Sequence, residues 1–325
     1  DSAGADPGPI VYGRGGTTLT VTDADTLLGR LDPAHFLGGE MPLYPDRARP
    51  AMQDLARQMG TSLDDAARGI VRVTNVNIDR ALRRVSIARG HDPRDFTLVA
   101  FGGAGPVHAC EVAAGLGIAR VLVPRYPGVL CALGLLMADV ALEASRPVLS
   151  IATLQLKAQL AQALDEMIDQ ARGELAREGI AEERMVFEGL IDARYRGQSH
   201  ELTVPLTGVH SASEAFHQAH ARTYGHAMRH RKVEIVNLRL QATGLIEKPD
   251  LSPEPVVKRD GQEALLGRRT VVGARETRQA NLYDRHRLAP GAAFPGPALV
   301  VQLDSTLYLP PGWQAQVDGH RNLIL

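Results

Sequence analysis

The chain has 325 residues, a length that predicts two domains or one domain with a smaller appendage. Its 36 Lys and Arg residues almost balance its 37 Asp and Glu residues, and the formal net charge of −1 gives no electrostatic footprint for a nucleic acid or an anionic membrane. Hydrophobic residues make up 44% and aromatic residues only 4%, so aliphatic side chains must fill the core. This composition excludes a disordered chain, a collagen-like chain and a disulfide scaffold.

The two cysteines, Cys110 and Cys131, are expected to be buried thiols in a reducing cytosol rather than a disulfide or a zinc site. The longest apolar run, residues 127–138, is shorter than the ~20 residues of a membrane span. We therefore expect a cytoplasmic protein with neither a membrane nor a nucleic acid as partner. Because the sequence begins at Asp1 in a turn-rich stretch, we also expect it to be the C-terminal part of a longer polypeptide.

Residues 1–46 predict loops and one short strand at Leu19–Thr22, which ends at Asp23. A capping-box pattern at Ser62 and a glycine at Gly90 predict a helix between them. Its apolar residues occur on more than one face, which indicates a helix buried on most sides.

The next segment predicts a strand, a glycine turn, a helix and a second strand. The apolar run Phe96–Phe101 is typical of a buried strand, and it leads through Gly102–Gly105 into a helix at Val107–Leu116. Val121–Val123 predicts the following strand. This order indicates a β-α-β unit with parallel strands, so the predicted fold class is α/β.

After residue 140 the pattern changes to alternating strands and amphipathic helices. The predicted elements are a helix at 154–178 closed by Gly179, paired strands at 186–195 and 201–206, a helix capped by Ser211 and Glu214 that runs to Tyr224, a strand at 233–245, a linker at 249–255 and short strands from 270 to 325.

The turn Gly102–Gly105 is the sharpest candidate for a ligand site. Glycines after a strand let the backbone approach a ligand, and the next helix offers free N–H groups at its N-terminus. The alternative is a tight turn without a ligand, and the local pattern leaves both open. The turn is no Walker A loop, because no Lys-Ser/Thr follows, and His108 stands where a dinucleotide fingerprint has its third glycine.

Four further residues are candidates, each with a structural alternative. Asn75 and Asn77 interrupt the predicted helix and either contact a ligand or tie the helix to a neighbouring loop. Asp23 either orients a water or a metal, or caps a turn. His108, in the first turn of a helix, is expected to be partly exposed and is either a proton carrier or a surface side chain.

The histidines of the second half form the series H-x2-H-x5-H-x3-H, but no carboxylate or cysteine completes a ligand set, so we expect no metal site there. The series is His217, His220, His226 and His230. No nucleophile elbow and no Cys/His nucleophile arrangement is found either.

One longer motif is Arg-Gly-His-Asp-Pro-Arg-Asp-Phe at 89–96, followed by Ala-Phe-Gly-Gly-Ala-Gly-Pro at 100–106. This motif and further stretches, which follow in the order that the family has them, resemble the A-subunit family of ATP-dependent hydantoinases and 5-oxoprolinases. The resemblance covers nearly the whole chain. The further stretches are 2–9, 12–17, 20–24, 28–31, 36–41, 127–128, 132–136, 195–198, 234–239 and 296–298.

The resemblance implies the second lobe of an actin-like (RNase H-like) ATPase domain, followed by an α+β region and a β-rich C-terminal segment. Residues 1–148 are then the C-terminal part of the hydantoinase A ATPase domain. Residues 149–325 are the hydantoinase A C-terminal region, with an α+β part at 149–248 and a β-rich part at 256–325.

The resemblance also implies that Gly102, Gly103, Ala104 and Gly105 form the adenosine-side loop for ATP, which is used with Mg. The two phosphate loops of the family, of the Asp-x-Gly-Gly-Thr type, lie upstream of this sequence, and Gly15–Thr17 lacks the preceding Asp. Mg is then held mainly by residues outside this chain, and we expect the chain alone not to hydrolyse ATP.

The implied reaction is the opening of a cyclic amide, such as a hydantoin or 5-oxoproline, through a phosphorylated intermediate. The implied partners are a B-type subunit or a fused second half, and the upstream half of the A subunit. Two alternatives stay open: a subunit of an acetone- or acetophenone-type carboxylase, and a non-catalytic fragment that docks to a partner.

Overall fold

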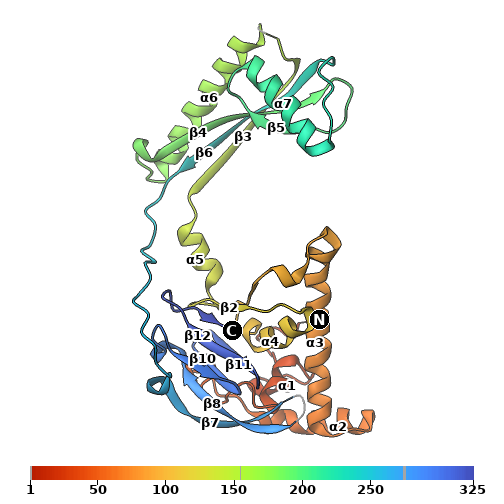
Figure 1. Cartoon of the computed structure of the whole chain (residues 1–325), viewed down its shortest axis with the longest axis vertical. Helices are drawn as coiled ribbons and strands as arrows, with labels where there is room; N and C mark the ends of the chain where they lie inside the picture. Colours follow the sequence, from red (N-terminus) through yellow and green to blue (C-terminus); the bar gives the residue numbers. More distant parts are fainter. Residues whose placement is uncertain (1, 154, 274–275) are drawn as a thin grey trace. The chain divides into compact units, whose positions relative to one another are not determined.

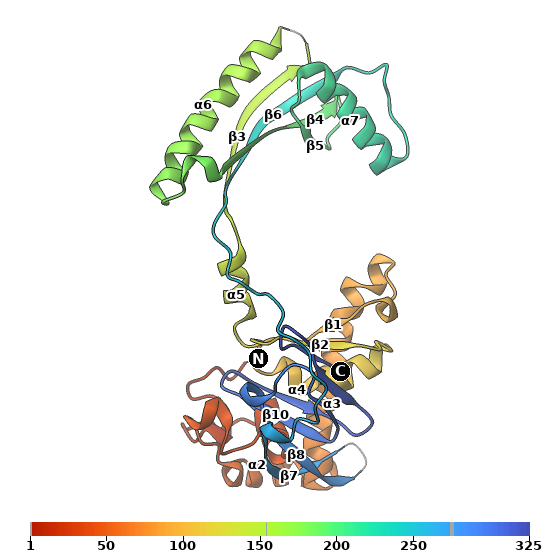
Figure 2. The ribbon, with the colours of Figure 1, turned by 60° about the vertical axis from the view of Figure 1, so that its left-hand side comes forward.

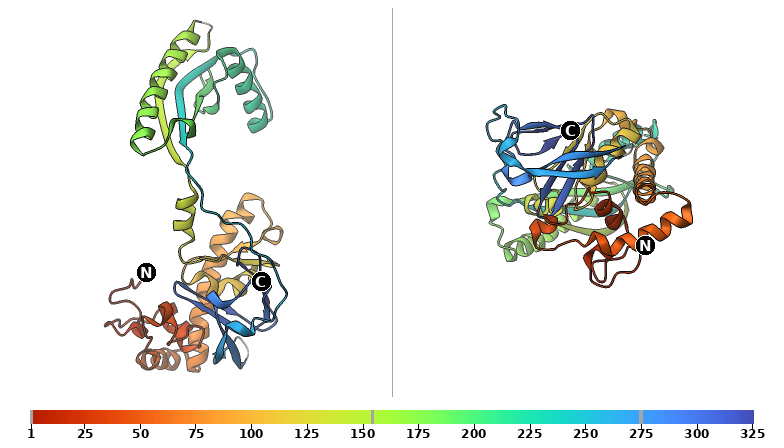
Figure 3. Two further views of the ribbon diagram at one scale, coloured as in Figure 1. Left: turned by 90° about the vertical axis from the view of Figure 1, so that its left-hand side faces the viewer. Right: turned by 90° about the horizontal axis from the view of Figure 1, so that it is seen from below.

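The computed structural model describes residues 2–153, 155–273 and 276–325, which form two compact units. Unit 1 contains Asp1–Leu133 and Asp250–Leu325, and unit 2 contains Gly134–Pro249. The two segments of unit 1, red to yellow and blue in Figure 3, pack together. The domain division at residue 148 stays a prediction, and the compact units divide the chain elsewhere. In the described part of the chain, no helix is long and apolar enough to cross a membrane.

Unit 1 begins with a helix where the sequence predicted a strand. The Oγ1 of Thr20 accepts a hydrogen bond from the N–H of Asp23, and the carboxylate of Asp23 accepts one from the N–H of Thr20. This capping box starts a helix, so the strand at Leu19–Thr22 was wrong. The helices of unit 1 are α1 (Val21–Leu27), α2 (Pro45–Met59), α3 (Leu63–Val85) and α4 (Gly105–Leu116), and α5 (Leu130–Met137) lies at its end.

The helix predicted from Ser62 is confirmed as α3, with Ser62 as its N-cap. It ends at Val85, and Gly90 closes the short 3-10 turn that follows. The expected burial on most sides was wrong, because Val73 is 62% and Val76 is 44% exposed. One face of the helix packs against α1, α2 and α4, whereas Val73 and Val76 lie on a side that is open to solvent.

The predicted β-α-β unit is confirmed. The N–H of Leu98 donates to the carbonyl of Arg120 at 3.0 Å, and the two strands pair in parallel on either side of α4. The strand predicted at Phe96–Phe101 is shorter than expected, since it contains only Leu98–Val99. It is also more exposed than expected, because Val99 and the nearby Phe101 are about half exposed. Its sheet has the order β1 (Leu98–Val99), β2 (Val121–Val123), β13 (Leu323–Ile324), β12 (Gln314–Val317) and β9 (Ala293–Pro295).

A second sheet in unit 1 comes entirely from the β-rich C-terminal segment. Its order is β11 (Ser305–Leu309), β10 (Ala298–Gln302), β8 (Thr277–Asp284) and β7 (Leu265–Val272). Helix α4 packs between α3 and the strands β2 and β11 (Figure 1).

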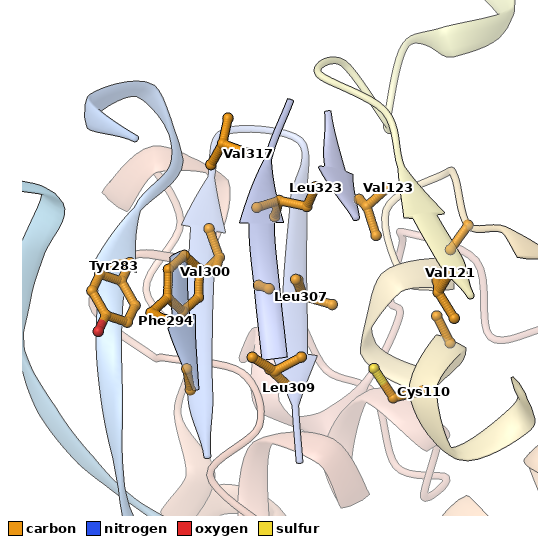
Figure 4. Packing of buried hydrophobic residues seen from close by; sticks show 14 of the residues in the cluster. Cys110, Val121, Val123, Tyr283, Phe294, Val300, Leu307, Leu309, Val317 and Leu323 are labelled. Atoms are coloured by element: carbon orange, nitrogen blue, oxygen red, sulfur yellow. The ribbon is translucent and has the colours of Figure 1, made fainter. Parts of the chain in front are cut away.

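The C-terminal strands share one hydrophobic core with the β-α-β unit. The rings of Tyr283 and Phe294 lie 4.3 Å apart in this core, and Cys110 of α4 points into it (Figure 4). Each large apolar side chain buried in this way stabilises the fold by roughly 1.5–3 kcal/mol. The expectation of two buried thiols holds for Cys110 alone, because Cys131 is exposed.

Unit 2 is a four-stranded antiparallel sheet whose core-facing side is covered by two helices (Figure 2). Phe216 of one helix and Leu175 of the other both pack on strand residues such as Ile191 and Leu238. The sheet order is β3 (Val140–Ile151), β6 (Val233–Gly244), β4 (Met185–Tyr195) and β5 (Leu202–Pro205), and the helices are α6 (Leu156–Arg177) and α7 (Val209–Tyr224).

The helices and strands predicted for unit 2 are therefore confirmed, except that position 154, the expected start of the first helix, lies outside the described residues. Strand β3 was not predicted, and the expected cap of α7 was misplaced. Gly208 is its N-cap, and Ser211 lies inside the first turn, where its hydroxyl donates to the carbonyl of Gly208. Glu214 pairs with Arg229 instead of closing a capping box.

We predict that Gly29→Ala destabilises unit 1 more than Gly60→Ala. Both glycines have a positive φ, +73° and +64°, but a Cβ at Gly29 would lie 2.3 Å from the carbonyl oxygen of Thr270, whereas Gly60 has open space. The left-handed conformation costs about 1–2 kcal/mol for either alanine, and the clash with β7 adds about 1–3 kcal/mol. Urea unfolding measures both losses, and equal losses would contradict the close approach.

Candidate functional site

The four residues predicted to form a nucleotide loop lie together between β1 and α4. Gly102 has a φ of +79°, and Gly103 and Ala104 are exposed. Ala104 is the N-cap of α4 and provides no capping side chain, so no side chain covers the first-turn N–H groups of the helix. A Cβ on Gly102 would have nothing within 4 Å, and one on Gly105 would approach no atom more closely than 4.0 Å. The turn thus leaves open space that packing within the chain does not explain.

This turn forms one wall of a cavity of about 230 Å³ in unit 1. Tyr12, Leu31, Phe36 and Leu37 form a second wall, and residues from α1, from α4 and from the turn between β10 and β11 form the others. Those with polar side chains are Thr22, Asp25, His108, Gln302, Asp304, Ser305 and Thr306.

His108 is buried, with 4% of its surface exposed, so the expectation of a partly exposed histidine was wrong. Its Nε2 lies 3.5 Å from a carboxylate oxygen of Asp25. Burial, followed by the nearby Arg30 guanidinium, lowers the pKa of His108 below its usual value. Burial and the guanidinium thus favour the neutral imidazole, and the role of His108 as a proton carrier stays a prediction.

A buried charged cluster beside the cavity escaped the sequence reasoning. Arg30 makes two hydrogen bonds to Glu111, at 2.7 and 3.1 Å, and its guanidinium lies 4.7 Å from the ring centre of Tyr308. Burial raises the pKa of the neighbouring Asp25 to about 7, although Arg30 opposes this shift. The available signal was Glu111, a single charge within the apolar helix Val107–Leu116.

The two candidate asparagines have different surroundings. The side-chain amide of Asn75 donates to Glu111 at 2.7 Å and so joins α3 to the charged cluster. Asn77 is exposed. The structural alternative, a tie to a neighbouring element, is thus seen for Asn75, and ligand contact by either residue stays a prediction.

Asp23 lies in the first turn of α1 and not at a strand end. Its carboxylate accepts hydrogen bonds from the N–H of Val11 at 2.8 Å and from the N–H and hydroxyl of Thr20 at 2.8 and 2.7 Å. The side chain is fully buried. These bonds give Asp23 the capping role that was its structural alternative.

The histidine series lies in unit 2, where its members hold local structure. The Nδ1 of His217 lies 2.7 Å from the hydroxyl of Tyr195, and the Nδ1 of His220 lies 2.7 Å from the carbonyl oxygen of His226. Within the ranges that the structure describes, no group of three or more His, Cys, Asp or Glu residues could hold a metal ion.

Fold and site together define an α/β protein in which a glycine turn between a strand and a helix opens into a cavity. Residues 1–144 match the family model described as hydantoinase/oxoprolinase, and residues 150–325 match the hydantoinase/oxoprolinase C-terminal domain. The chain belongs to the hydantoinase/oxoprolinase family.

Two curated relatives carry different activities in their names. The chain is 31% identical to caprolactamase subunit alpha of Pseudomonas jessenii, over 98% of this chain and 47% of that protein. It is 32% identical to the acetophenone carboxylase gamma subunit of Aromatoleum aromaticum, over 100% of this chain and 47% of that protein. The chain therefore spans about half the length of the curated relatives that it matches.

Two solved structures share the fold. A nucleotide-free acetone carboxylase matches with a TM-score of 0.90 and 24% identity, over 97% of this chain and 48% of that one. The ATP-dependent caprolactamase of Pseudomonas jessenii matches with a TM-score of 0.73 and 29% identity, over 99% of this chain and 49% of that one. The α/β fold class is thereby shared with solved members of this family.

We predict that Asp23→Ala lowers the free energy of unfolding by about 2–4 kcal/mol, because it leaves the N–H groups of Val11 and Thr20 without their acceptor. Asp23→Asn keeps one acceptor oxygen and should lose less. Chemical denaturation measures both, and an Ala variant as stable as the unchanged protein would contradict the capping role.

We predict that the stability difference between the unchanged protein and Asp25→Asn depends on pH. The folded-state pKa of Asp25, about 7, exceeds the ordinary value of 3.8, so the folded chain holds this proton more tightly than the unfolded chain does. The stability from this group is complete below about pH 4 and is lost as the pH rises through about 7. The asparagine does not titrate. Denaturation between pH 4 and 8 should therefore show the difference falling by more than about 1 kcal/mol, and a constant difference would contradict it.

Proposed function

We propose that the chain is part of an ATP-dependent enzyme that activates a cyclic amide for ring opening, and that Gly102–Gly105 contacts the adenosine side of the nucleotide. The observation that carries this proposal is the open space beside the turn. Any residue other than glycine would place a side chain in this space and leave less room for a ligand. The N-terminus of α4, which has no side-chain cap, adds the N–H of Gly105 and a positive dipole end next to the same space. Pro106 has no N–H, and the N–H of Val107 donates to the carbonyl of Ala104.

The proposal assigns unit 1 to the second lobe of an actin-like ATPase. ATP would supply a phosphoryl group that turns a stable amide oxygen into a leaving group, which is the reason to couple ring opening to ATP. In this chain, Gly102, Gly103, Ala104 and Gly105 would bind and orient the nucleotide. Mg and the terminal phosphates would be held mainly by the family's phosphate loops, which the resemblance assigns to sequence outside this chain.

Ring opening of a 5-oxoproline- or lactam-type amide is supported by the family model and by the name of the caprolactamase relative. A carboxylase role is the second candidate, supported by 32% identity to the acetophenone carboxylase gamma subunit. Turnover of a cyclic amide or of a ketone with bicarbonate by the complete gene product would separate the two.

Exposed apolar groups on unit 1 support a partner. Strand β1 is the edge strand of its sheet, and Val99 on it and Phe101 just after it are about half exposed. Val73 and Val76 of α3 are exposed as well. Apolar groups left open in this way mark an interaction surface. We propose that the remaining half of the A subunit covers this surface and that a B-type subunit or fused second half completes the cytoplasmic enzyme. If the chain instead only docks, it would bind that half without binding nucleotide.

We predict that Gly105→Ala weakens ATP binding by about tenfold or more while leaving the fold intact. A Cβ at Gly105 would approach no atom of the chain more closely than 4.0 Å, so the fold accepts it. In our proposal this Cβ would lie where the nucleotide binds. Titration of the complete gene product with a fluorescent ATP analogue measures the affinity, and urea unfolding checks the fold.

The matched control is Gly173→Ala in α6, which also has open space around its Cβ position but lies in unit 2. It should bind ATP as tightly as the unchanged protein. Equal affinity in the two variants would remove the turn from the nucleotide site, and no ATP binding by the unchanged gene product would overturn the proposed function itself.

A further inference from the structure

The glycine turn is held by a residue from the other end of the chain. The hydroxyl of Ser305, at the start of β11, lies 3.2 Å from the carbonyl oxygen of Gly103 and 3.3 Å from that of Gly102, and it donates its proton to them. Ser305 is buried, with 8% of its surface exposed, whereas Gly103 is exposed. Some 200 residues of sequence separate the donor from its acceptors.

Asp304 holds the neighbouring loop in the same way. One of its carboxylate oxygens accepts a hydrogen bond from the N–H of Gly128 at 2.9 Å, and the carbonyl of the preceding residue, Pro127, accepts one from the N–H of Gly102 at 2.7 Å. A Cβ on Gly128 would lie 2.5 Å from the Asp304 carboxylate, so only glycine permits this approach. Asp304 therefore reaches the glycine turn through the loop after β2.

The bonds to the carbonyls also fix where the N–H groups of the turn point. In a trans peptide the C=O and the next N–H point in opposite directions. With Ser305 on the carbonyls of Gly102 and Gly103, the N–H groups of Gly103 and Ala104 must point away from Ser305. Among the described residues, neither N–H has a hydrogen-bond acceptor. Gly103 and Ala104 are exposed, so these two N–H groups are open to solvent and available to a ligand.

We propose that Asp304 and Ser305 are positioning residues for nucleotide binding: they set the turn so that the N–H groups of Gly103 and Ala104 donate to an acceptor atom of the nucleotide. The inference deepens the proposed function and rests on it. It gives the β-rich C-terminal segment a part in the nucleotide site, because the turn between β10 and β11 lines the same cavity as Gly103 and Ala104.

Removal of the Ser305 hydroxyl tests the proposal in the complete gene product. Ser305→Ala should raise the dissociation constant of a fluorescent ATP analogue about three- to tenfold, as expected for one lost hydrogen bond in the support of a donor pair. Ser305→Thr keeps the hydroxyl and should restore tight binding. Asp304→Ala should weaken binding in the same direction, and Asp304→Asn, which keeps an acceptor oxygen, should weaken it less.

A second readout needs no nucleotide. Hydrogen exchange of the amide of Gly102, which donates to the carbonyl of Pro127 at 2.7 Å, reports the order of the turn directly. Compared between the unchanged protein and Ser305→Ala, it should be faster in the variant. Ser145→Ala, an exposed serine on β3 in unit 2, is the matched control and should change neither affinity nor exchange at the turn. A thermal unfolding midpoint shared by all variants separates a positioning role from general destabilisation.

The outcomes are distinguishable. Unchanged affinity and unchanged exchange in Ser305→Ala would overturn the inference while leaving ATP binding by the turn intact. Faster exchange in Ser305→Ala, together with no ATP binding by the unchanged protein, would overturn the proposed function and with it the nucleotide role of these residues. Weaker binding that Ser305→Thr does not rescue would show that the hydroxyl is not the group that matters, and it would also overturn the inference.

Discussion

The rest of unit 1 depends on the interactions of one buried group, the guanidinium of Arg30. It follows α1, bonds twice to Glu111 of α4, and lies over the ring of Tyr308 in β11. Asn75 of α3 joins the same carboxylate. A buried charge is tolerated only when its partners are in place, so four elements must assemble in one arrangement around it. Removal of one partner would leave an uncompensated buried charge, which is strongly destabilising.

This arrangement explains why the cavity and the glycine turn are built from distant parts of the chain. His108 and Glu111 lie in α4, shortly after the glycine turn, and Asp25 of α1 lies beside His108. The C-terminal strands then complete the core of α4 and add the Asp304–Ser305 turn. A chain that ended before β10 would keep the glycine turn in its sequence but lose one wall of its cavity.

The family relationship does not by itself select one reaction for this chain. Relatives named for lactam cleavage and for ketone carboxylation are equally similar to this chain, at 31% and 32% identity. In our proposal the two reactions share an activation step that uses ATP, and this chain would serve that step. The group that reacts next would then be chosen by parts of the enzyme outside the glycine turn.

By itself, the sequence determined the local elements whose signals are short-range. Periodicity and capping residues predicted the parallel β-α-β unit, α3 with its Ser62 cap and the strands β4, β5 and β6 of unit 2, but not β3. The family followed from motifs such as residues 89–106. Contacts between residues far apart in the sequence could not be predicted from it. Thr20 and Asp23 formed a helix cap where alternation suggested a strand, and His108 became buried because the tertiary structure placed Asp25 and the C-terminal strands over it. Local propensity depends on neighbours in sequence and can be predicted from them. The burial and pKa of His108 and the hydrogen bonds of Ser305 depend on contacts between residues far apart in sequence, some 200 residues in the case of Ser305, and only the tertiary structure shows them.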